Sequence, residues 1–388
     1  MEALQALVDT GYESMWMHVR PDAVRALYNP VLRERLRWYY AVLRGIAPPK
    51  FKLVRSVESP LQGDELQEAS LEDLMRAHKD AASMFRDEWG PALEEPEKAT
   101  RLARTFPRWS LLHLKAELAK RLTSPCILCD RKCRVDRASG RLGACRLAWD
   151  VYVHTAFLHL GEESPLVPSG TIFYGGCNFT CVFCQNYDVS QTEARRGFKA
   201  TPRSLAALQD LLAARGARNI NHVGGDPTPS MHVIVESLLY VRSDIPQLWN
   251  SNMYMSPEAM EVLVDLIDIW LPDFKWGDNR CARRLSIVPS YVETVTRNLE
   301  TAARHGDMII RHLVMPDHIE CCTRRVLEWI ASHLPLDRVV VNVMGQYTPQ
   351  HLVERNPRKW RDIARRVSRE EVEEAKWYAS SLGLYLLD

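Results

Sequence analysis

Apolar residues recur along the chain at two different spacings, and the spacing changes after about residue 120. In the first part the apolar side chains follow the three- and four-residue intervals of helices that bury one face, over residues 31–45, 70–85 and 111–122. Ser70, with Asp73 three residues later, is typical of a helix start. APPKF and GPALEEPEK predict loops. We therefore expect a helical region over residues 1–122.

Short apolar stretches that end in polar or glycine-rich turns alternate with helical patterns from about residue 170 onward. The helical patterns include residues 202–216 and 256–267. The expected strands are residues 170–176, 219–225, 247–252, 267–275, 307–316 and 338–344. Alternation of strands and helices favours a parallel sheet. We expect an α/β protein with a partial (β/α)6 TIM-like barrel and a C-terminal helical segment over residues 166–388, with chemistry at the carboxyl ends of the strands.

Composition and charge narrow the classes of function. The 388 residues include 50 Lys and Arg and 49 Asp and Glu, so no overall field draws the protein to nucleic acid or to an anionic membrane. The first residues have no basic start and no continuous apolar run, and no stretch approaches the ~20 apolar residues of a membrane span. We expect a cytoplasmic protein whose ten cysteines are reduced, so that clusters among them are metal ligands or redox groups.

The basic run over residues 355–371, which contains Trp360, has two interpretations. It has the composition of a nucleic-acid contact. The balanced total charge and the acidic residues that follow favour a solvated helix face instead.

Three cysteines, Cys177, Cys181 and Cys184, follow the first expected barrel strand directly. Three cysteines in a glycine-flanked loop are a poor match to small packing residues. A closed zinc site usually has four protein ligands, and the iron–sulfur clusters of electron carriers are also held by four. Three thiolates leave one iron without a protein ligand, which suits the binding of a substrate or cosubstrate.

This loop resembles the hallmark of the radical S-adenosylmethionine (SAM) superfamily, CxxxCxx-aromatic-C, with Phe183 in the aromatic position. The resemblance implies that the three cysteines hold a [4Fe–4S] cluster whose open iron binds SAM. It further implies reductive cleavage of SAM to a 5′-deoxyadenosyl radical that abstracts hydrogen, with electrons from a donor such as ferredoxin or flavodoxin.

Further segments resemble the pyruvate formate-lyase activating enzyme-like proteins, over roughly residues 126–350. They are LHLGEESPLVPSGTIFYGG, CILCDRKCRV, GGDPTP, LPDFKWGD, IIRHLVMP and VNVMGQYTP. The resemblance implies an oxidoreductase of the activating type, and it does not extend to the N-terminal 120 residues.

The same resemblance assigns the SAM contacts. Gly224, Gly225 and Asp226 match a GGE-type motif with Asp in place of Glu, although the segment also reads as a turn. The two glycines permit close approach of the backbone to a ligand. The next expected strand ends in Asn250, Ser251 and Asn252, which correspond to positions near the SAM methionine carboxylate and ribose.

Asp273 and Lys275 match an Asp-x-Lys pattern that contacts SAM, and a surface ion pair is the alternative. Arg311 and His312 lie in an apolar strand, where one faces inward and the other outward; we assign Arg311 to the SAM site. Tyr347 and His351 are weaker candidates for the substrate side, and no catalytic residue is assigned.

Four cysteines lie upstream in a short basic segment, which we expect to form a metal-binding module over residues 123–165: Cys126, Cys129, Cys133 and Cys145. The set suits zinc or a second, auxiliary iron–sulfur cluster, or consists of inert thiols. His154 and His159 are substitute ligands. Cys281, Cys321 and Cys322 lack the spacing of a full ligand set, and we interpret them as ordinary thiols.

The substrate stays open at this point. One hypothesis is a partner protein on which the enzyme makes a glycyl radical. A second is modification of a small molecule, a peptide or RNA. A third is a non-catalytic scaffold in which both cysteine sets bind zinc.

Overall fold

A computed structural model describes residues 16–101 and 106–387, and these form one eight-stranded sheet with the order β3-β1-β2-β4-β5-β6-β7-β8. The parallel strands are β2 (Ser169–Tyr174), β4 (Ile220–Gly224), β5 (Gln247–Ser251), β6 (Ile269–Pro272), β7 (Asp307–Leu313) and β8 (Val339–Met344). Two antiparallel strands, β1 (Val151–His159) and β3 (Phe198–Ala200), extend the sheet beyond β2. Because the two edge strands, β3 and β8, do not pair with each other, the sheet is an open partial barrel, which confirms the expected fold class.

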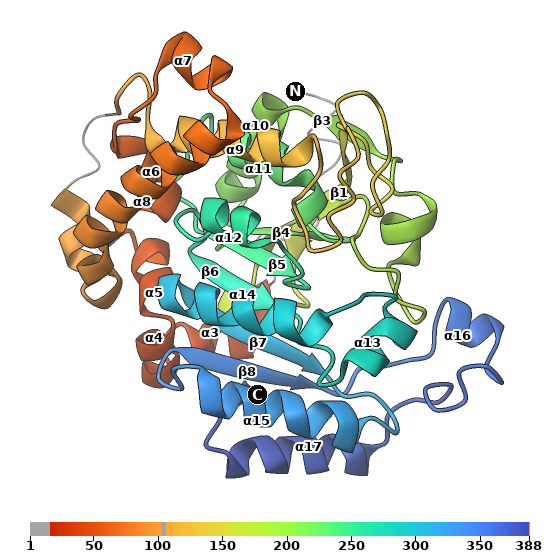
Figure 1. Cartoon of the computed structure of the whole chain (residues 1–388). Coiled ribbons are helices and arrows are strands. Elements are labelled where there is room, and N and C mark those ends of the chain that lie inside the picture. The colour runs from red at the N-terminus through yellow and green to blue at the C-terminus, as the bar shows by residue number, and fades with distance from the viewer. Residues whose placement is uncertain (1–15, 102–105, 388) are drawn as a thin grey trace.

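Helices follow most parallel strands and cover the outside of the sheet (Figure 1). They are α10 (Pro202–Ala214), α11 (Met231–Ser237), α12 (Pro257–Leu263), α13 (Asn279–Leu285), α14 (Tyr291–His305), α15 (Arg324–His333), α16 (Leu352–Arg355) and α17 (Arg369–Ser381). Short helical turns are η2 (Ser164–Leu166), η3 (Asp188–Thr192), η4 (Thr228–Ser230) and η5 (Ile319–Thr323).

The N-terminal region is helical, as expected, over the part that the structure describes. It consists of α2 (Trp16–Val19), α3 (Pro21–Ala26), α4 (Pro30–Arg35), α5 (Arg37–Leu43), α6 (Lys50–Ser56), α7 (Gly63–Glu68), α8 (Leu71–Glu94), η1 (Pro96–Arg101) and α9 (Leu111–Thr123). The Ser70 hydroxyl caps α8 by accepting from the Asp73 N–H over 3.1 Å, which confirms the predicted helix start. The first fifteen residues, including the expected absence of a signal peptide, lie outside the described residues.

Three expectations were wrong. The GPALE segment continues α8 through Pro91, because Trp89 and Ala92 are buried and their packing outweighs the local loop preference. Strands β1 and β3 were missed. The basic run over 355–371 is not one helix, since the chain between α16 and α17 is irregular, and Trp360 is buried beneath Arg284 and Lys359.

The N-terminal helices close the amino-terminal end of the barrel. Alternate strand residues divide between two hydrophobic clusters, so that Leu248, Ile309 and Val340 pack with Leu36 and Tyr39 on the inner face. The neighbouring strand residues pack outward, in the larger cluster. Figure 1 shows α4 and α5 beside the ends from which β7 and β8 start. The opposite, carboxyl ends of the strands are therefore the end at which a site has room.

The three predicted domain ranges share a single large hydrophobic cluster, to which Leu112, Cys129 and Trp249 all belong. The boundaries at residues 122 and 165 stay a prediction. Within the described ranges, every helix is too short or too polar to cross a membrane.

Candidate functional site

A cavity of about 210 Å³ lies at the carboxyl ends of the parallel strands. Every residue that the sequence assigns to the three-cysteine cluster or to SAM lines it. These residues are Cys177, Cys181, Cys184, Gly224, Gly225, Asp226, Asn250, Ser251, Asn252, Asp273, Lys275 and Arg311. Positions from the ends of β2, β4, β5, β6 and β7 therefore meet in one place.

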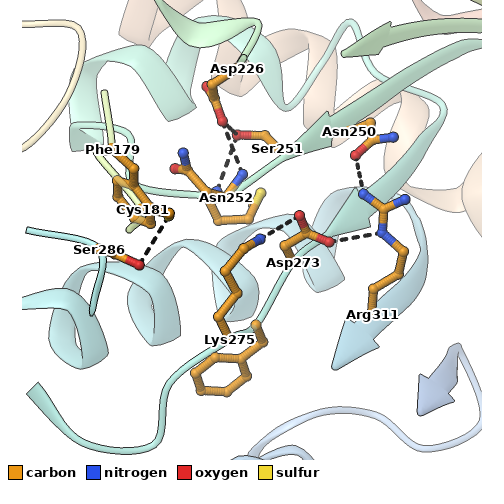
Figure 2. A network of polar contacts seen from close by, with 12 residues as sticks. Phe179, Cys181, Asp226, Asn250, Ser251, Asn252, Asp273, Lys275, Ser286 and Arg311 are labelled. Carbon is orange, nitrogen blue, oxygen red and sulfur yellow. Dashed lines mark hydrogen bonds and ion pairs between the residues drawn. The ribbon is translucent and has the colours of Figure 1, made fainter. Parts of the chain in front are cut away.

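The three-cysteine loop is held by backbone hydrogen bonds to the end of α13. The N–H groups of Thr180 and Val182 donate to the carbonyls of Ser286 and Leu285 over 3.1 and 2.9 Å. Cys181 Sγ lies 3.1 Å from Ser286 Oγ, as Figure 2 shows. Backbone groups thus attach the loop to the end of α13, and the sulfurs of the three cysteines line the cavity wall.

Burial controls the protonation of these thiols. It raises the pKa of Cys177, of Cys184 and of Cys181, the last to about 12, and the negative charge of the neighbouring thiolates raises the first and last further. Lys275 acts in the opposite direction on Cys181 and Cys184. The thiols on their own are therefore neutral near pH 7, and thiolates at this place need a bound cation.

Gly224 and Gly225 bring the end of β4 against the three-cysteine loop. Gly224 has a φ of +126°, and a Cβ there would lie 2.2 Å from the Tyr174 carbonyl oxygen. A Cβ on Gly225 would lie 2.0 Å from the Gly176 carbonyl oxygen. Close approach to β2 and its loop thus already requires both glycines, in addition to the predicted approach to a ligand.

Asp226 organises the turn after β5. One carboxylate oxygen accepts from the Ser251 hydroxyl and from the Asn252 N–H, both over 3.0 Å (Figure 2). The other oxygen accepts from the Thr228 N–H over 2.9 Å. Burial raises the pKa of Asp226, and these donors partly offset the rise. With both oxygens occupied, Asp226 is a positioning residue for Ser251 and Asn252.

A chain of ion pairs and hydrogen bonds runs along the cavity wall from Lys275 to Asn250. Lys275 Nζ lies 2.5 Å from Asp273 Oδ2, Arg311 Nε lies 2.8 Å from Asp273 Oδ1, and the same guanidinium donates to Asn250 Oδ1 (Figure 2). Burial alone would raise the pKa of Asp273, but Arg311 and Lys275 hold it below its usual range. The group is therefore ionised and lines the cavity, unlike the surface ion pair that was the alternative.

Asn250 and Arg311 both direct polar groups toward the cavity. Asn250 Nδ2 is buried without a hydrogen-bond partner in the described part of the chain, so it is free to donate to a ligand. Arg311 faces inward, whereas His312 faces outward and hydrogen-bonds to Phe274 O and Thr323 Oγ1 over 2.8 and 2.9 Å. The choice of Arg311 over His312 is thereby explained by strand alternation.

A buried pair of glutamates beneath Arg311 was missed. Glu162 Oε2 lies 3.6 Å from Arg311 Nη1, and Glu163 Oε1 accepts from Asn342 Nδ2 over 2.9 Å. Burial raises the pKa of Glu163 to about 7, although Arg311 acts against the rise. Two adjacent acids in the apolar context LGEESPLV are the signal that identifies such a pair.

The two weaker substrate-side candidates differ in position. Tyr347 lines the cavity with its ring beside Phe183, centroids 5.9 Å apart, and its hydroxyl donates to the Ile363 carbonyl. His351 stacks on Tyr187 and is not part of the lining.

The upstream cysteines lie next to the three-cysteine loop but do not line the cavity. Burial, together with the charges of Cys126, Cys133 and Cys145, raises the pKa of Cys129, so the four are electrostatic neighbours. Arg131 of this segment donates to the carbonyls of Asn178 and Ile287. That these four cysteines bind zinc or a second cluster stays a prediction.

His159 and His154, the proposed substitute ligands, differ in their hydrogen bonding. His159 Nδ1 lies 3.1 Å from Glu162 Oε1, so one of its ring nitrogens already has a partner. His154 Nε2 is buried without a partner among the described residues.

The fold brings together the three other cysteines, which the sequence analysis interprets as ordinary thiols. Cys281, His318, Cys321 and Cys322 form a group whose ligand atoms all lie within 4.8 Å of one another, the only such group of His, Cys and acidic residues among those described. Sequence spacing hid it, because Cys281 is on α13 and the others are at η5, beyond β7.

Comparisons with known proteins agree with the fold. The sequence model of the radical SAM superfamily matches residues 171–330. The uncharacterized protein MJ0674 of Methanocaldococcus jannaschii is 38% identical over 366 residues, which cover 91% of this chain and 99% of that protein.

Solved structures are similar only in part. Streptococcus suis SuiB bound to S-adenosylmethionine has a TM-score of 0.40 at 12% identity, over 54% of this chain and 47% of that one. A domain of a pyruvate-formate lyase-activating enzyme from Bacteroides vulgatus has a TM-score of 0.34 at 16% identity, over 43% of this chain and 96% of that one. On the sequence matches, this chain belongs to the radical SAM superfamily, whose enzymes use SAM and a [4Fe–4S] cluster.

Proposed function

We propose that the cavity is the site at which the protein reductively cleaves SAM and directs hydrogen abstraction from a substrate. The observation that carries the proposal is the meeting of three cysteines, a glycine-rich strand end and an ionic chain in one cavity. When bound, the cluster supplies the electron that cleaves SAM. The protein holds, orients and encloses both groups.

The donor set fits a cluster better than a single ion. Cys177, Cys181 and Cys184 share the cavity. Among the described residues, however, their sulfurs are not a group in which every atom lies within 4.8 Å of the others. A cluster bound through three different irons needs sulfurs that lie farther apart than the ligands of one ion.

The cavity wall fits the amino-acid end of SAM. Lys275 is the ammonium that a bound carboxylate needs, and Asp273 and Arg311 fix its position. Asn250 Nδ2 offers a hydrogen bond that no described residue takes. Ser251 and Asn252, oriented by Asp226, present the turn beside them.

The hydrogen donor that we propose is a glycine of a partner protein, with electrons supplied by a ferredoxin or flavodoxin. This step rests on the sequence segments that resemble the activating enzymes. A small molecule, a peptide and RNA are the competing substrates, and a zinc scaffold without activity is the competing role.

Anaerobic reconstitution separates these roles. Iron, sulfide and SAM with dithionite should give 5′-deoxyadenosine, and a protein that binds only zinc and forms none would contradict the enzyme proposal. A glycyl-radical signal in electron paramagnetic resonance, after mixing with a glycyl-radical-type enzyme of the same organism, supports the protein substrate. Deuterium transfer into 5′-deoxyadenosine from a labelled small molecule, peptide or RNA would overturn that choice.

A further inference from the structure

We propose that Cys281, His318, Cys321 and Cys322 bind one zinc ion in a closed structural site of the Cys3His type. This group lies outside the cavity lining and outside the upstream four-cysteine segment. The zinc proposal therefore does not depend on the proposed SAM chemistry.

The distances match one tetrahedral ion. Zinc–sulfur bonds of about 2.3 Å and zinc–nitrogen bonds of about 2.0 Å place sulfurs about 3.8 Å apart and sulfur and nitrogen about 3.5 Å apart. Cys321 Sγ lies 3.8 Å from Cys281 Sγ and 3.7 Å from Cys322 Sγ. His318 Nδ1 lies 3.5, 3.3 and 3.9 Å from the sulfurs of Cys281, Cys321 and Cys322.

The far side of the imidazole has the partner that a metal-binding histidine requires. His318 Nε2 lies 3.1 Å from Asp362 Oδ2, so an N–H there donates to the carboxylate and leaves Nδ1 as the acceptor that faces the sulfurs. Arg284 fixes Asp362 in turn, with Nη1 donating to Oδ1 over 3.2 Å. The same guanidinium offsets negative charge from three thiolates.

Competing roles fit the group less well. A disulfide needs sulfurs about 2.0 Å apart and would exclude the histidine, whereas Cys321 Sγ lies 3.7 Å from Cys322 Sγ and 3.8 Å from Cys281 Sγ. Thiolates and imidazole favour zinc over magnesium or calcium. Four protein ligands fill a tetrahedral ion, which makes the site structural and not catalytic.

The site fastens the support of the three-cysteine loop. Cys281 belongs to α13, whose end holds that loop through Leu285 and Ser286. Trp276 connects the two places, with its ring 6.0 Å from His318 and 5.8 Å from Phe183 and its N–H donating to Ser286 Oγ. Figure 1 places α13 near the arrowheads of β7 and β8. One ion here joins α13, η5 and the segment that carries Asp362.

Zinc content of the full-length protein, purified anaerobically, tests the proposal. Cys281→Ser should lower zinc by one equivalent, and Cys126→Ser, the matched control in the other cysteine set, should keep this equivalent. Zinc-edge X-ray absorption of the Cys126→Ser protein should report three sulfurs and one nitrogen. Unchanged zinc in Cys281→Ser, iron in its place, or an intact mass that shows a disulfide among these cysteines would overturn the assignment.

A milder variant covers the case in which Cys281→Ser does not fold. Asp362→Asn keeps all four ligands and removes only the carboxylate behind His318, so zinc affinity in a chelator competition should fall about 10- to 100-fold. Asp317→Asn is the matched control, because Asp317 is exposed and its one charged partner in the described part of the chain is Arg365. Equal zinc affinities in the two variants would contradict the site.

Discussion

Arg311 Nε donates to Asp273 Oδ1 over 2.8 Å and thereby ties the end of β6 to β7 in the cavity wall. The backbones of the same two residues form a parallel bridge, so side chain and strand geometry agree. The guanidinium also faces Glu162 on its inner side. One partly buried cation thus serves both the proposed SAM site and the acids inside the barrel.

Arg311→Met should therefore destabilise the protein by up to about 3 kcal/mol, because it leaves the buried Glu162 and the partly buried Asp273 without their cation. Urea unfolding of the anaerobic protein without SAM measures it. Arg369→Met removes an exposed ion pair with Glu373 and should leave the midpoint nearly unchanged. Equal midpoints for the two variants would show that Arg311 has no such role.

The raised pKa of Glu163 predicts a pH dependence of stability. Its value rises from 4.5 to about 7 on folding, because burial favours the neutral acid. The folded state then binds the proton more tightly, so the free energy of unfolding should fall between pH 4.5 and 7, by up to about 3 kcal/mol, and level off above. The free energy of unfolding of Glu163→Gln, relative to that of the wild type, should therefore increase from pH 4.5 to 7. A stability difference that stays constant from pH 4.5 to 8 would contradict the assignment.

Gly225→Ala should displace the three-cysteine loop, because its Cβ would meet the Gly176 carbonyl at 2.0 Å. We expect the reconstituted variant to lose most of the iron held by that loop, as measured by iron and sulfide content. Gly90→Ala is the control and should bind iron like the wild type, because beyond its chain neighbours and its own helix backbone no atom lies within 4 Å of the added Cβ in α8. Equal iron contents would refute the packing argument.

Local signals in the sequence account for most of the barrel and the cavity. The six parallel strands and the residues at their carboxyl ends follow from apolar stretches that stop at glycine and polar turns, and a parallel sheet gathers those ends on one side. The resemblance to the superfamily then supplied roles that spacing alone does not define.

The missed features depend on contacts between distant segments. Cys281 becomes part of a candidate ligand group only because the chain after β7 brings η5, with Cys321 and Cys322, next to α13. Glu163 depends on Asn342 of β8 for its position inside the barrel. The GPALE segment was predicted as a loop because the burial of Trp89 cannot be inferred from neighbouring residues.

Formation of 5′-deoxyadenosine by anaerobically reconstituted protein tests the central claim most directly. With SAM and dithionite, the wild type should form it. Cys126→Ala should retain this cleavage, because no upstream cysteine lines the cavity. Cys184→Ala should form none, because it removes one of the three thiols at the cavity wall. A wild type that leaves SAM intact, or a Cys184→Ala variant that cleaves it at the wild-type rate, would contradict the account.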